Sequence, residues 1–186
     1  MSQFPRLETA RTIIRMAEVQ DVTAILAYYQ VNRAHLEPYE PIRPPGFDTE
    51  AYWQQEVQHR RTDFIEGRSL RLFIFERVPN SPIIGSVNLN NIVRGVFQAG
   101  SLGYSLAAVK QGQGYMGEAL KALIAYSFDD LKLHRIMAAY MPRNHRSGSL
   151  LKRLGFQIEG VARDYVRING RWEDHILTSL VNSLPL

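Results

Sequence analysis

A glycine-rich break between two segments of different periodicity constrains this chain more than any other feature. Residues 97–106 have the character of a strand, whereas residues 114–131 carry apolar side chains at helical spacing. The break between them reads QGQGYMG and contains Gly112, Gly114 and Gly117. A chain that turns from strand to helix exposes backbone N–H groups without an intrahelical partner, and glycine lets an anion approach them closely. We therefore predict a phosphate or pyrophosphate site here.

Two common nucleotide-binding loops fit this break poorly. The Walker loop needs Gly-Lys followed by Ser or Thr, where this chain has Met116, Gly117 and Glu118. The glycine spacing does match the G-x-G-x-x-G fingerprint. That fingerprint opens a βαβ unit, however, and here the break lies mid-chain after segments that read as an antiparallel meander. A turn that binds nothing is the alternative.

Composition indicates one domain, residues 1–186, that is long enough to bury a sizeable core. The absence of cysteine excludes a disulfide framework, a thiol nucleophile and a cysteine metal site. The five histidines are scattered, so we expect no metal centre. The sequence has neither an apolar leader nor a run long enough to span a bilayer, so we expect a cytoplasmic protein without a membrane partner.

The positive charge of the chain, +4 in total, gathers in its C-terminal half. There, only Glu159 and Asp164 oppose a run of basic residues: Lys132, Arg135, Arg143, Arg146, Lys152, Arg153, Arg163, Arg167 and Arg171. Such a surface attracts the phosphates of a cofactor or an RNA-rich partner such as the ribosome; alternatively, it is an ordinary solvated face.

Periodicity and turn signals predict a mixed α/β (α+β) fold. The expected strands cover residues 7–16, 70–77, 83–93, 97–106, 134–141, 156–168 and 172–180, the last two joined by an Asn169-Gly170 hairpin turn. The expected helices cover residues 22–32 after an Asp21 cap, 48–66, 114–131 and 147–154, and a proline-rich segment occupies residues 33–47. Seven strands or so would form one mostly antiparallel sheet flanked by helices.

This order of elements resembles the GNAT acetyltransferase fold, and Gln111-Gly112-Gln113-Gly114 resembles its acetyl-CoA loop. More narrowly, four segments look like the Rim-type ribosomal-protein-alanine N-acetyltransferases: HLEPYEP, NNIVRGVFQAGSLGYSL, HRIMAAYMPRNHRSGSLLKRLGF and INGRWEDHILTSL. The resemblance covers nearly the whole chain.

The resemblance implies a set of acetyl-CoA contacts. Backbone groups of Leu106, Ala107 and Val109 would pair with the pantetheine arm, and the pyrophosphate would lie against the amides of Gln111, Gly112, Gln113, Gly114, Tyr115, Met116 and Gly117. Asn144 would contact the cofactor arm, although a helix-entry cap is its alternative role. Ser147 would lie near the departing sulfur, where its own alternative is a place at a helix N-terminus.

The resemblance also implies direct transfer of an acetyl group from the thioester to an amine. The tyrosine acid of many GNAT enzymes is matched here by Leu151, which leaves Ser147 as the substitute, and the glutamate base of a related enzyme is matched by Val166. Glu40 in the proline-rich loop is our first choice for binding or deprotonating the amine. Weaker candidates are Asp164, Glu173, Asp174 and His175, each explained equally well as a structural or surface residue.

Three functions follow from these residues. The first is acetylation of a protein N-terminus, the N-terminal alanine of a small-subunit ribosomal protein. The second keeps the enzyme but changes the acceptor to a polyamine, an amino acid or an antibiotic. The third is a non-catalytic acyl-CoA-binding or ribosome-assembly module, because a fold by itself does not determine function.

Overall fold

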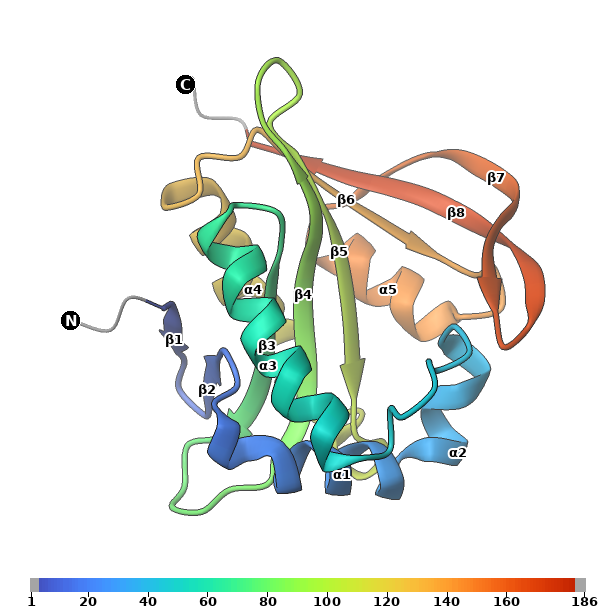
Figure 1. Cartoon of the computed structure of the whole chain (residues 1–186). Helices are drawn as coiled ribbons and strands as arrows, with labels where there is room; N and C mark the ends of the chain where they lie inside the picture. Colours follow the sequence, from blue (N-terminus) through green and yellow to red (C-terminus); the bar gives the residue numbers. More distant parts are fainter. Residues whose placement is uncertain (1–3, 183–186) are drawn as a thin grey trace.

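A computed structural model describes residues 4–182 of the chain. Its centre is one eight-stranded sheet of order β1-β2-β3-β4-β5-β6-β8-β7, in which only the β5–β6 pair is parallel (Figure 1). The α/β class and the mostly antiparallel sheet are therefore confirmed.

The strand count of about seven was too low, because residues 7–16 form two strands. β1 (Arg6–Glu8) and β2 (Thr12–Arg15) make an antiparallel hairpin. Between them the Thr9 amide donates to the Thr12 carbonyl at 2.9 Å, and the Thr9 hydroxyl oxygen accepts the Thr12 N–H at 2.9 Å. A threonine that bonds to nearby backbone groups closes the turn without glycine or proline, so the usual turn signal is missing.

The other elements follow the predicted order, with ends shifted by a few residues. They are η1 (Val19–Asp21), α1 (Val22–Val31), α2 (Arg33–Leu36), η2 (Glu37–Tyr39), α3 (Glu50–Ile65), β3 (Leu70–Glu76), β4 (Ile83–Val93), β5 (Ala99–Leu106), η3 (Ala108–Lys110), α4 (Tyr115–Asp129), β6 (Arg135–Tyr140), α5 (His145–Arg153), β7 (Gln157–Ile168) and β8 (Arg171–Val181).

Two predicted helix starts differ in detail from the structure. Asp21 precedes α1, but its carboxylate binds the Arg15 guanidinium at 2.6 and 2.8 Å and makes no cap bond to that helix. The helix predicted from residue 48 begins at Glu50, because the Thr49 side chain accepts the Tyr52 N–H. At α3 the neighbouring Thr49 is thus the cap, a choice between adjacent polar residues that a sequence pattern cannot make.

Two apolar cores lie on opposite faces of the sheet, with α4 and α5 on one face and α1 and α3 on the other. Strand β3 serves both. Its Leu72 and Ile74 join the α4 side, whereas Phe73 and Phe75 join the α1 and α3 side around Trp53. Burial on both faces explains the nearly continuous apolar run of β3.

The parallel pair β5–β6 is short. Its paired residues run from Ala99 opposite Arg135 to Leu102 opposite Ala138, after which β5 continues to Leu106 while β6 pairs with β8 alone. We call this divergence, visible in Figure 1, the splay. On the other side of β5, the Ala107 N–H donates to the Ile84 carbonyl at 2.8 Å. Because ladder bonds alternate along a strand, the backbone groups of Tyr104 and Leu106 point toward the splay.

Asn32 attaches the end of β5 to the helical layer. Its buried amide follows α1, where Nδ2 donates to the Tyr28 carbonyl at 2.9 Å and Oδ1 accepts the Ala108 N–H at 3.0 Å. Ala108 opens η3, the turn that precedes the glycine-rich break. Asn32 therefore fixes where that break begins.

We predict that Asn32→Ala lowers the free energy of unfolding by about 1–3 kcal/mol, because it leaves the Ala108 N–H without its acceptor. Urea denaturation followed by circular dichroism measures the change. Gln30→Ala, an exposed position on the same helix, is the control and should change stability far less. Equal stability of Asn32→Ala and wild type would contradict this role.

Candidate active site

The glycine-rich break turns directly into the first turn of α4. Gly112 and Gly114 both adopt left-handed backbone conformations, with φ of +75° and +84°. Gly114 is the residue before the helix, and the first backbone bond of the turn runs from the Glu118 N–H to the Gly114 carbonyl at 3.1 Å. The amides of residues 114–117 therefore have no acceptor within the helix. Free amides at a helix N-terminus are what an anion site requires, so the phosphate site stays a prediction that this geometry suits.

Arg11, in the β1–β2 turn, fixes this loop from outside. Its Nη1 donates to the Gln113 carbonyl at 3.0 Å, and its Nε donates to the Glu118 carboxylate at 2.8 Å. Its guanidinium also lies over the Tyr115 ring, 4.4 Å from the centroid. Burial alone would raise the pKa of Glu118, but hydrogen bonds from Thr9 and Arg11 outweigh it and lower that pKa. The negative charge of Glu118 beside the anion site is thus matched by a cation.

The remaining predicted loop residues have internal partners. The Tyr115 hydroxyl donates to Glu76 at 2.6 Å, and the Gln111 side chain contacts Arg146 and, at 2.8 Å, His35. The Val109 carbonyl accepts from the Gln113 side chain at 2.8 Å, and Met116 is buried in the core. Both backbone groups of Ala107 are bonded, to Ile84 and to Lys110, so of the three predicted pantetheine contacts only Leu106 turns its backbone toward the splay.

Asn144 and Ser147 meet at the start of α5. Asn144 is the N-cap of this helix, and its Oδ1 accepts the Ser147 N–H at 3.2 Å, so the cap role considered for Asn144 is present. The helix predicted from residue 147 therefore begins two residues earlier, at His145. The Ser147 hydroxyl lies 2.7 Å from the hydroxyl of Tyr104 on β5. Leu151, one turn further along, is 1% exposed and belongs to the core.

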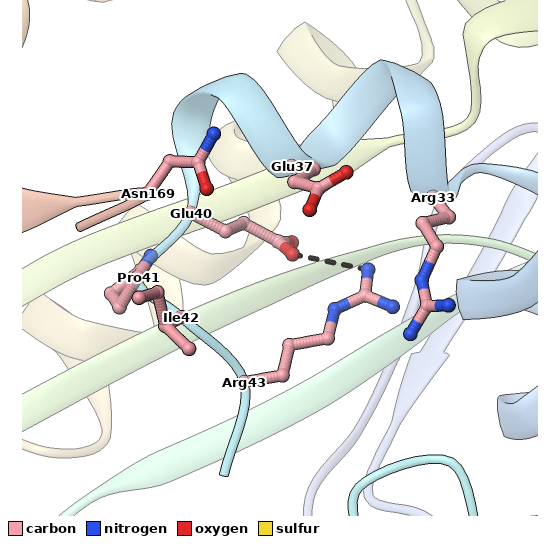
Figure 2. Close-up of a pocket in the computed structure, with 7 residues that line it drawn as sticks. All are labelled: Arg33, Glu37, Glu40, Pro41, Ile42, Arg43 and Asn169. Atoms are coloured by element: carbon pink, nitrogen blue, oxygen red, sulfur yellow. Dashed lines mark hydrogen bonds and ion pairs between the residues drawn. The ribbon is translucent and has the colours of Figure 1, made fainter.

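Glu40 lines a separate pocket of about 180 Å³, shown in Figure 2. Its walls are Arg33, Glu37, Glu40, Pro41, Ile42, Arg43 and Asn169. The Glu40 carboxylate lies 3.3 Å from Arg43, whose guanidinium also lies over the Tyr29 and Phe47 rings. Burial raises the pKa of Glu40, and Arg43 offsets only part of that effect. This carboxylate therefore retains a proton to a higher pH than an exposed one.

Three segments close around this pocket. The Asn169 N–H of the β7–β8 turn donates to the Glu40 carbonyl at 2.9 Å. Arg143, in the loop between β6 and α5, donates to the Pro38 carbonyl at 3.3 Å and to the Glu173 carboxylate at 2.6 Å. The proline-rich loop, the terminal hairpin and the start of α5 are thereby joined.

The weaker acid–base candidates have structural partners. Glu173 is paired with Arg143, and the Asp174 carboxylate accepts the Asp164 N–H at 2.9 Å. His175 is buried, with Nδ1 at 2.9 Å from the Glu173 carbonyl. Between residues 4 and 182, no cluster of three histidine or carboxylate side chains could hold a metal ion. In the same part of the chain, no helix has the length and apolarity needed to cross a membrane.

Comparison with known proteins identifies the family. The family model described as "Acetyltransferase (GNAT) domain" matches residues 11–157. The chain belongs to the GNAT acetyltransferase family. The expected GNAT fold and N-acetyltransferase activity are thus confirmed, and acetyl-CoA is the co-substrate, as expected. The reading as a non-catalytic module loses its support.

Several relatives in sequence and structure are named as acetyltransferases of ribosomal proteins. The chain is 42% identical over 175 residues to the [ribosomal protein uS5]-alanine N-acetyltransferase of Escherichia coli K12, covering 94% of this chain and 90% of that protein. The crystal structure of ribosomal-protein-S5-alanine acetyltransferase from Vibrio fischeri has a TM-score of 0.91 at 39% identity, covering 96% and 97% of the two chains. Mycobacterium smegmatis RimJ in complex with CoA-disulfide has a TM-score of 0.87 at 25% identity, covering 98% and 89%.

This GNAT site thus combines predicted residues with others that the sequence did not reveal. The structure brings Asn144 and Ser147 together and places free amides at the glycine-rich turn, while Glu40 lies in the neighbouring pocket. Arg11, Asn32 and Tyr104 were missed. The signal that singles out Arg11 is its contact with the glycine-rich loop. That contact joins residues more than 100 positions apart, so no local sequence pattern reveals it.

We predict that Gly114→Val weakens acetyl-CoA binding about tenfold, because a β-branched residue is strained in the left-handed conformation and its side chain would meet Arg11. Isothermal titration calorimetry gives the affinity. Gly67→Val imposes the same backbone strain (φ +70°) in the turn after α3, where a Cβ meets nothing within 4 Å, and serves as the control. Unchanged acetyl-CoA affinity in a folded Gly114→Val protein would contradict the assignment of this loop to acetyl-CoA binding.

Proposed function

We propose that this enzyme transfers an acetyl group from acetyl-CoA to the N-terminal amine of a protein, and that its acceptor is the N-terminal alanine of a small-subunit ribosomal protein. The observation that carries the proposal is the 42% identity, over 94% of this chain, to a protein named for that reaction on uS5. A ribosomal acceptor would place the enzyme in the cytoplasm, as the sequence led us to expect.

In the proposed acetyl transfer, Glu40 acts on the attacking amine and Ser147 acts on the departing sulfur. A neutral amine attacks the thioester carbonyl, the new C–N bond forms, and the C–S bond breaks with its electron pair on sulfur. An α-amine has a pKa near 8, so a modest base suffices. Glu40, whose pKa is raised by burial, binds the protonated amine or accepts its proton through water. The Ser147 hydroxyl donates a hydrogen bond to the departing thiolate.

The cofactor arm would lie along the splay, where Leu106 offers its backbone groups. Asn144, as the cap of α5, would set the position of the helix start beside that arm. The pyrophosphate would lie against the amides of residues 111–117. These placements hold the thioester ready for direct attack by the amine, so the proposed reaction needs no protein nucleophile.

The basic C-terminal half supports an approach to the ribosome. Arg135 and Arg143 are paired with carboxylates, and Arg146 contacts Gln111. The others form no ion pair with any residue that the structure describes: Lys132, Lys152, Arg153, Arg163, Arg167 and Arg171. Cations that form no ion pair are available to phosphates of ribosomal RNA.

A small polyamine is the second candidate acceptor. The pocket that holds Glu40 also holds Glu37, and a carboxylate pair suits a cationic amine. The chain is 28% identical over 138 residues to the spermidine N(1)-acetyltransferase of Vibrio cholerae, covering 74% of this chain and 72% of that protein. Arg33 and Arg43 in the same walls oppose a polycation and favour the protein acceptor.

We predict that acetyl-CoA turnover, followed as free thiol release, occurs with an Ala-initiated peptide from a small-subunit ribosomal protein and not with the same peptide carrying a blocked N-terminus. Spermidine and free lysine complete the panel. The reason is that an unblocked α-amine with a pKa near 8 is about half neutral near pH 8 and can attack, whereas the blocked peptide has no free α-amine. Turnover confined to the small amines would replace the protein acceptor with the second candidate.

We predict that Glu40→Gln lowers kcat/KM for the acceptor peptide about 10²-fold and leaves KM for acetyl-CoA unchanged, because the carboxylate acts on the amine and not on the cofactor. Steady-state kinetics with each substrate varied in turn separate the two effects. Glu66→Gln, at the far end of α3, removes the same charge away from the site. Equal peptide kinetics in Glu40→Gln and wild type would exclude Glu40 from the reaction.

A further inference from the structure

We propose that Tyr104 is a positioning residue that aims the Ser147 hydroxyl at the thioester sulfur. The inference rests on the proposed role of Ser147 and adds a residue that the sequence analysis did not consider. Tyr104 and Ser147 come from opposite sides of the splay, one from β5 and one from α5, and their hydroxyl oxygens are 2.7 Å apart. The contact therefore lies where the two halves of the sheet part.

The position of Tyr104 in β5 makes it suitable for this role. It lies two residues beyond Leu102, the last residue of β5 that pairs with β6. Its backbone is held against Val87 of β4, so the strand supplies a rigid base for the side chain. Ser147 is fixed from the other direction, because Asn144 accepts its N–H at 3.2 Å. Two hydrogen bonds thus fix the position of Ser147: Asn144 binds its backbone N–H, and Tyr104 binds its hydroxyl.

The direction of the hydrogen bond follows from the chemistry of the two hydroxyls. Burial raises the pKa of Tyr104 to about 12, so the phenol keeps its proton at neutral pH. A phenol is a stronger hydrogen-bond donor than an aliphatic alcohol, so Tyr104 donates and the Ser147 oxygen accepts. The hydrogen of Ser147 is then free to point at another acceptor. In an acetyl transfer that acceptor is the sulfur.

The proton balance of the step requires no ionisation of Tyr104. As the C–S bond breaks, sulfur keeps the electron pair and Ser147 stabilises the thiolate through its hydrogen bond. The proton released by the attacking nitrogen passes through Glu40 or water and finally neutralises the thiolate. Tyr104 remains protonated throughout and acts only by orienting Ser147.

A double-mutant cycle tests the proposal. Steady-state kinetics with the unblocked peptide compare wild type, Tyr104→Phe, Ser147→Ala and the double variant. We predict that Tyr104→Phe lowers kcat about 3- to 10-fold with KM for acetyl-CoA unchanged, and that it lowers kcat no further in the Ser147→Ala background. The control is Tyr28→Phe, which removes another buried tyrosine hydroxyl, 2.9 Å from Ser105. It should keep wild-type kcat.

Two outcomes overturn the role of Tyr104: wild-type kcat in Tyr104→Phe, or full additivity in the double variant. Wild-type kcat in Ser147→Ala would instead remove Ser147 from the proposed mechanism, and the two failures are thereby distinct. If Tyr104→Phe does not fold, 3,5-difluorotyrosine at residue 104 keeps the shape and lowers the pKa of the phenol. The alkaline limb of kcat should then move to lower pH, and an unmoved limb would contradict the proposal.

Discussion

The early end of the β5–β6 pairing is the constraint on which this structure depends. Four residue pairs hold the two strands together, and after Leu102 and Ala138 each strand keeps a partner on one side only. Unpaired backbone groups need hydrogen bonds, and along this stretch an extended ligand can supply them. The cofactor arm of a GNAT enzyme is such a ligand. In the proposed complex, the cofactor arm would therefore take the place of a paired strand within the splay.

Three side-chain contacts keep the elements around the splay in place, and each joins segments far apart in the sequence. Asn32 holds η3 across 76 residues, Arg11 holds the first turn of α4 across 107, and Tyr104 reaches Ser147 across 43. None of them extends the sheet or a helix. They fix the relative positions of elements that backbone hydrogen bonds alone would leave independent.

The same distances explain what the sequence could and could not predict. Strands, helices and the glycine-rich loop are signalled by residues within a few positions of one another, so β4 was predicted over residues 83–93 and found there. Gly112 and Gly114 were identified because they lie at a local break between strand and helix periodicity, and both prove to have left-handed backbone conformations. Arg11 and Tyr104 have no such local signal, since each is an ordinary residue of a turn or strand until its distant partner is known.

In the proposed mechanism, the group that acts on the sulfur and the group that acts on the amine come from different elements of the fold. Consecutive residues of β5 point to opposite faces, so Tyr104 reaches Ser147 on one face while Ser105 bonds to Tyr28 on the other. The Tyr104–Ser147 contact joins two hydroxyls, whereas Glu40 contacts the Arg43 guanidinium in a pocket of its own. An amine must lose its proton before it attacks, and a thiolate must be stabilised as it leaves. In the proposed mechanism each group therefore acts on its own substrate, Ser147 on the departing sulfur and Glu40 on the attacking amine.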